Sequence, residues 1–92
     1  MNNEINKSED IYALFAYKVR KELKSLLDAS VYVANDNDVL VIRINKGPFS
    51  FNHMIPQIGP KLLDGLTVES VVREVTELYK NRVLSWFFYK YR

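Results

Sequence analysis

The side chains in this sequence that could do chemistry are few and scattered. Histidine occurs once, as His53, and the 92 residues include no cysteine. A lone imidazole is more often a packing or surface group than a general base, and without a second histidine or a cysteine a transition-metal site lacks ligands. Asp36 and Asp38 have a spacing that can hold Ca²⁺, but the glycine and the distal glutamate of a calcium-binding loop are missing. We expect a polar hairpin tip there.

Other catalytic signatures are also missing from the sequence. The three glycines are too scattered to form a phosphate-binding loop, and no serine has the G-x-S-x-G context of a hydrolase nucleophile. Three carboxylates lie together in sequence, but their helical spacing puts them opposite the apolar stripe, on the side expected to face water: Glu69, Glu74 and Glu77. We predict no catalytic residues, no metal or cofactor site, and a protein that is not an enzyme.

Composition points to one small domain in a reducing compartment. Hydrophobic residues make up 48% and charged residues 26% of the chain, which is ordinary for a globular protein. The lack of cysteine fits the cytosol, where disulfides are rare. The first ten residues are polar, without the apolar core of a signal peptide, and no stretch could span a bilayer. We therefore expect a cytoplasmic location.

Two long helices should frame the elements of this domain. We expect a flexible start over 1–8, then a helix from Glu9 to Leu27 with Ser8 as its N-cap. A second long helix should begin after Thr67 and continue to the end of the chain. The residues that helical spacing predicts as the buried stripes are Ile11, Tyr12, Phe15, Ala16, Val19, Leu23, Leu26 and Leu27 in the first helix, and Val68, Val71, Val72, Val75, Leu78, Tyr79, Val83 and Trp86 in the second.

Short runs of β-branched residues lie between the two helices. We predict strands over 30–34 and 38–45, a weaker third strand over 49–54, and a connector over 55–65 that holds one short helical turn. The fold class is therefore α+β, in the order α-β-β-(β)-α. A small antiparallel sheet carries both long helices on one face, and residues 9–92 form a single domain.

The same element order occurs in double-stranded RNA-binding domains, which grip phosphate with a lysine cluster at the start of the second helix. Here the corresponding stretch, residues 67–74, is neutral to acidic. The chemistry does not match, so this order carries no functional argument.

The end of the second helix is the surface that the core does not explain. Beyond Asn81, apolar residues fall on the face of the helix that carried Arg73 and Glu77 in earlier turns. A helix with apolar residues on every side must be shielded from water on every side. No acid follows Glu77, so this end is also basic. The candidate partner-binding residues are Leu84, Phe87, Phe88 and Tyr91, with Arg82 and Lys90.

Three interpretations of this end compete. It could pack back on the sheet, or contact a protein (a second copy or a different chain), or stack its aromatics on single-stranded nucleic acid while its cations meet phosphate. We favour a non-enzymatic binding domain that works through protein–protein contact. The richness in Asn, Lys, Ile and Tyr adds a further alternative, an accessory protein of a phage or mobile element that binds and inhibits a host protein.

A secondary surface lies on the outer side of the first helix. Its residues are Leu14, Tyr17, Lys18, Lys21 and Lys24. We expect a solvated lysine face that happens to carry two apolar side chains, with a role in binding an acidic partner or nucleic acid only if it joins the basic end of the second helix. Association with a membrane is not expected.

Overall fold

The computed structural model describes residues 3–90 of the chain and has the predicted α+β order. Its elements are α1 (Asn3–Leu27), β1 (Ser30–Asp36), β2 (Val39–Lys46), β3 (Phe49–Pro56), the short helix α2 (Ile58–Leu63) and α3 (Val68–Lys90). All three strands extend a little beyond their predicted ends, and the third is as long as the second. The connector holds one short helix, as expected.

The three strands form an antiparallel sheet in the order β1-β2-β3, joined by two tight hairpins. In the first hairpin Asn37 and Asp38 have φ of 54° and 62°. Positive φ at both central residues is the requirement of a type I′ turn, and Asn and Asp tolerate it. In the second hairpin Gly47 has φ of 59° and precedes Pro48, as the first central position of a type II′ turn requires.

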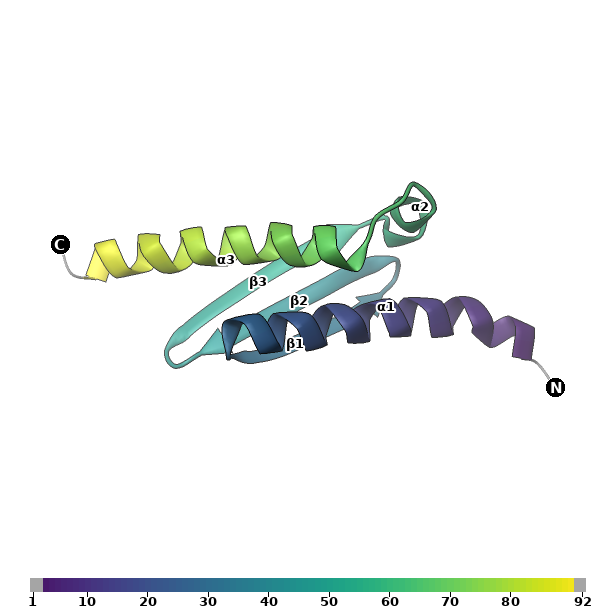
Figure 1. The fold of residues 1–92 in the computed structure, drawn as a ribbon, viewed down its shortest axis with the longest axis horizontal. Coiled ribbons are helices and arrows are strands. Elements are labelled where there is room, and N and C mark those ends of the chain that lie inside the picture. Colours follow the sequence, from purple (N-terminus) through teal and green to yellow (C-terminus); the bar gives the residue numbers. More distant parts are fainter. Residues whose placement is uncertain (1–2, 91–92) are drawn as a thin grey trace.

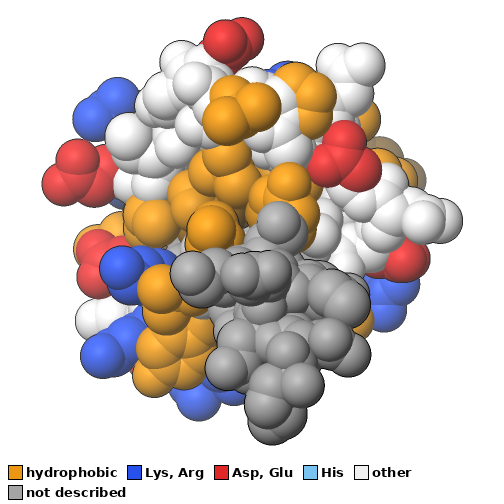
Figure 2. All heavy atoms as spheres, turned by 90° about the vertical axis from the view of Figure 1, so that its right-hand side faces the viewer, with side chains coloured by type: hydrophobic (Ala, Val, Ile, Leu, Met, Phe, Trp, Pro, Cys, Tyr) orange, Lys and Arg blue, Asp and Glu red, His pale blue; other side chains and the backbone are white. Residues whose placement is uncertain are grey.

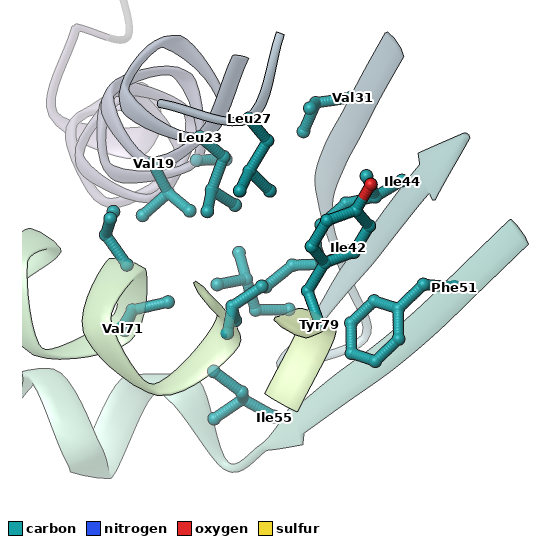
Figure 3. Packing of buried hydrophobic residues seen from close by; sticks show 14 of the residues in the cluster. Val19, Leu23, Leu27, Val31, Ile42, Ile44, Phe51, Ile55, Val71 and Tyr79 are labelled. Carbon is teal, nitrogen blue, oxygen red and sulfur yellow. The ribbon is translucent and has the colours of Figure 1, made fainter. Parts of the chain in front are cut away.

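Alternation along the strands separates a covered face of the sheet from an open one. The buried side chains of β2 are Leu40, Ile42 and Ile44, and the same face of β3 carries Phe49, Phe51 and Ile55. These side chains meet α1 and α3 in one core cluster (Figure 3). No described element covers the other face, where Tyr32 and Met54 are exposed.

Both long helices lie on the covered face, as predicted (Figure 1). The predicted stripes are correct in their centres and wrong at their edges: Ile11 and Leu26 of α1 and Leu78 of α3 are exposed. The physical reason is the two-layer architecture. A helix that rests on one sheet and one neighbouring helix buries a stripe of about 100°, which is narrower than the run of apolar residues in these sequences.

The two helices begin differently from each other. Thr67 is the N-cap of α3 as predicted, because its Oγ1 accepts a hydrogen bond from the Ser70 amide at 3.1 Å while Ser70 Oγ accepts one from the Thr67 amide at 3.2 Å. The prediction for α1 was wrong. This helix already begins at Asn3, so residues 3–8 are helical and Ser8 lies inside the helix. A serine followed by acids marks a favourable cap without excluding continuation of the helix.

The long helices are staggered along the molecule. Three antiparallel strands separate them in the chain, so α1 and α3 run in the same direction (Figure 1). The first turns of α1 extend past one end of the sheet, and the last turns of α3 extend past the other end. The molecule is accordingly elongated, 59 × 23 × 21 Å. The last described turns of α3 therefore have only part of the fold to pack against.

Candidate protein-binding surfaces

The extended end of α3 has one side that belongs to the core. Trp86 is half-buried and packs edge-on against Phe49, with ring centroids 6.2 Å apart and an interplanar angle of 67°. Val83 is also partly buried against the core cluster. Phe49 contacts Tyr79 in the same way at 5.5 Å. The first interpretation of the C-terminal end, packing on the sheet, is therefore correct for Val83 and Trp86.

The other side of the same turns is exposed. Leu84, Phe87 and Phe88 retain 54%, 49% and 62% of their accessible surface, and the rings of Phe87 and Phe88 meet at right angles, 6.2 Å apart. The spacing i, i+3, i+4 puts these three side chains on one stripe of the helix. We call them the α3 ridge. Tyr91, four residues after Phe87, continues this spacing in the sequence but lies outside the described residues.

The cations predicted to accompany this surface point elsewhere. The guanidinium of Arg82 lies over the ring of Phe51 at 6.0 Å, and the Lys90 ammonium lies over the ring of Trp86 at 5.8 Å. Phe51 belongs to β3 and Trp86 to the core side of α3, so Arg82 and Lys90 cover core aromatics. Sequence spacing alone does not show this, because long side chains reach across a helical turn. Beside the α3 ridge, Lys46 and Lys80 line a groove with Leu84.

The secondary surface on α1 is exposed, as predicted. Leu14 and Tyr17 retain 51% and 53% of their accessible surface, and Lys18, Lys21 and Lys24 are exposed beside them. Tyr17 lines a groove between α1 and β1, at the sheet edge farthest from β3 and α3. Tyr17 therefore lies beside the β1 edge, whereas the end of α1, at Leu27, borders Lys80 and Leu84 of α3.

That groove has a volume of about 540 Å³ and was not foreseen in the sequence. It is lined by Tyr12, Ala13, Ala16, Tyr17 and Arg20 of α1 and by Val33, Ala34 and Asn35 of β1. Arg20 donates a hydrogen bond from Nε to the carbonyl oxygen of Val31 at 3.1 Å. No sequence signal for the groove exists, since its walls are ordinary residues of two elements that only the tertiary fold brings together.

A second groove lies at the opposite end of the molecule from the α3 ridge. It has a volume of about 670 Å³ and lies between α1 and α2, with Ile11, Tyr12, Pro60, Leu62 and Leu63 among its walls. Figure 2 faces this end and shows hydrophobic side chains gathered at its centre. Leu63 retains 90% of its accessible surface. The connector that carries α2 gave no sequence reason to expect an apolar surface.

Three of the polar residues considered for chemistry, Asp38, His53 and Glu74, make contacts within the fold. Asp38 accepts a hydrogen bond from the Gly59 amide at 2.7 Å, which ties the first hairpin to α2. His53 Nε2 lies 3.1 Å from Glu74 Oε2, and its ring stacks on Phe51 at 6.4 Å. Among residues 11–90, whose side chains are described, no three His, Cys, Asp or Glu side chains group closely enough to hold a metal ion.

Comparison of the chain with protein-family models, with curated proteins and with solved structures found no match. Within residues 3–90 there is no helix whose length and hydropathy would let it cross a membrane.

Proposed function

We propose that this protein is a non-enzymatic binding domain, and that its α3 ridge pairs with the same ridge of a second copy. The observation that carries the proposal is the exposure of Leu84 and Phe88, at 54% and 62%, on one stripe of a helix that extends past its own sheet. Exposed aromatic and aliphatic residues that gather on a rigid helix are typical of interfaces. The absence of cysteine is the basis for proposing that it works in the cytoplasm.

Charge favours a second copy as the occupant. Arg82 and Lys90 are directed over core aromatics, so two ridges can meet without placing these cations against one another, provided that the pairing leaves the groove of Lys46 and Lys80 beside Leu84 open to water. An antiparallel pairing about a two-fold axis would bring Leu84 of each copy near Phe88 of the other. The same two cation positions weaken the nucleic-acid alternative, because Trp86 is already covered by Phe49 on one side and Lys90 on another.

The size of the ridge limits the strength of the dimer. Each half-exposed side chain can bury roughly 100 Å², so the three together supply about 300 Å² per copy, against about 800 Å² per partner in an interface of standard size. We therefore expect a reversible dimer with a dissociation constant in the micromolar range, in which the flanking turns of α3 add the remaining contact.

Sedimentation velocity over a range of concentrations tests this proposal. The wild type should shift from monomer to dimer as its concentration rises, and the double variant Leu84→Ser/Phe88→Ser should remain monomeric. Tyr89→Ser is the matched control, since Tyr89 is exposed at 82% on the same helix but lies outside the ridge. A wild type that stays monomeric at millimolar concentration, or a double variant that dimerises like the control, would refute the pairing.

The nucleic-acid alternative has its own test. It predicts that fluorescein-labelled single-stranded DNA or RNA binds at low salt and is released as salt increases. It also predicts that neutralising the exposed cations Lys80, Arg82 and Lys90 abolishes this binding. We expect no binding of either nucleic acid under conditions in which the dimer forms.

A further inference from the structure

The outer edge of β1 is a strand edge with unpaired hydrogen-bonding groups. β1 is the first strand of the sheet, so only its inner edge pairs with β2. The carbonyl of Val31 points outward, because it accepts the hydrogen bond from Arg20 at 3.1 Å. Backbone groups in an antiparallel strand alternate in direction with a period of two residues. The N–H and C=O groups of Val33 and Asn35 therefore also face the open edge.

The groove between α1 and β1 lies directly along this edge. Its floor includes Val33 and Asn35, and its helical wall includes the small side chains of Ala13 and Ala16. A volume of about 540 Å³ falls in the range of binding sites that take several side chains. The Oδ1 atom of Asn35 is buried there with no hydrogen-bond partner, and such an acceptor gains most from an added donor.

Among the described residues that line the groove, Arg20 carries the only charge, and Asp36 follows Asn35 at the end of β1. Residues 11–27, the part of α1 whose side chains the structure describes, carry Lys18, Arg20, Lys21 and Lys24 and a single acid, Glu22. Arg20 lines the groove itself, and Lys24 follows one helical turn later on the same side. A second copy would bring another helix face of the same net charge to this edge. A segment with carboxylates would instead find a guanidinium partner at the Val31 end.

We propose that the β1 edge binds an extended, acidic segment of another protein by strand addition. The segment would pair its backbone with Val33 and Asn35 and place alternate side chains in the groove against Ala13 and Ala16. An aspartate or glutamate at one end would meet Arg20. This site is separate from the α3 ridge, because β1 forms one edge of the sheet and α3 packs toward β3 at the other edge.

Nuclear magnetic resonance on the ¹⁵N-labelled full chain tests the proposal with a defined probe. The probe is the peptide Asp-Val-Thr-Val-Glu-Val, blocked at both ends, and its control is Lys-Val-Thr-Val-Lys-Val. We expect the acidic peptide to bind with a dissociation constant below about 1 mM and to shift the amide resonances of Val33 and Asn35 most. The basic peptide should leave these resonances unchanged.

Variants locate the binding on the edge and the groove. Arg20→Gln should weaken the binding of the acidic peptide by about tenfold, which is the effect of losing one charged hydrogen bond. Lys18→Gln removes the same charge outside the groove and should weaken the binding less. Ala13→Trp should block the groove, and it is compatible with folding because Ala13 is exposed. Its amide spectrum away from the groove reports that the fold is intact.

Four results with the peptides would overturn the proposal. These are no shift at several millimolar acidic peptide, equal binding of both peptides, shifts centred away from β1, and full binding to the Ala13→Trp variant. A wild type that dimerises through β1, seen as protected Val33 and Asn35 amides in the free protein, would also overturn it, because a second copy would then occupy the edge.

Discussion

One side chain from each side of the α3 end can be truncated, by Trp86→Ala and by Phe88→Ala. We expect the two variants to change the free energy of unfolding by different amounts. Trp86 is half-buried against Phe49 at 6.2 Å, and complete burial of a large aromatic is worth about 3–5 kcal/mol relative to alanine. Partial burial should reduce this to about 2 kcal/mol, which includes the edge-on contact with Phe49. Phe88 is 62% exposed, so its loss should change the free energy of unfolding of the monomer by less than about 0.5 kcal/mol.

Urea unfolding followed by circular dichroism measures both changes. Fluorescence does not serve here, because Trp86 is the only tryptophan and one variant removes it. The protein should be kept at low micromolar concentration so that dimer formation does not add to the stability of the wild type. If Phe88→Ala destabilises the monomer as much as Trp86→Ala, then Phe88 packs within the domain. The reasoning that leads to the α3 ridge would then be wrong.

Two further predictions concern Tyr79 in the core and Lys46 at the end of α1. Burial raises the pKa of the Tyr79 phenol above its ordinary value of 10.0. The folded state therefore holds this proton more tightly than the unfolded state, and the associated stability is present below pH 10 and lost as the pH rises through the folded pKa. The urea midpoint of the wild type should decrease between about pH 9 and pH 11, and Tyr79→Phe should make this decrease smaller. An equal decrease in the variant would contradict a raised pKa of Tyr79. Lys46 donates a hydrogen bond from Nζ to the Leu27 carbonyl at the last residue of α1, at 3.0 Å. Lys46→Met should cost about 1 kcal/mol in urea unfolding, with the exposed Lys80→Met as control, and equal costs would show that the contact contributes nothing.

Local chemistry made the hairpins and the α3 start predictable. Asn37 tolerates the positive φ of a type I′ turn, and the hydroxyl of Thr67 completes a capping pair with a residue three positions on. Neither depends on distant contacts. The start of α1 was not predictable in this way, because Ser8 can act as a cap and can equally lie within a helix.

The candidate surfaces also have some features that the sequence predicted and others that depend on the fold. The periodicity of the last turns was enough to show that Leu84 and Phe88 could not share the face of Val75 and Tyr79. Whether they were covered depended on how far α3 extends past the sheet, which is a property of the staggered helices. The positions of Arg82 and Lys90 depended on which rings lay within reach of their long side chains.

By itself, the amino-acid sequence determined the α+β class, the two hairpins, the centre of each buried stripe and the lack of any cysteine or paired histidine. These follow from short-range geometry and from composition. Only the tertiary structure decided which apolar side chains face water, which cations lie over core rings, and that the β1 edge borders an open groove. Each of these depends on the placement of elements distant in the chain, and helical or strand periodicity carries no information about that placement.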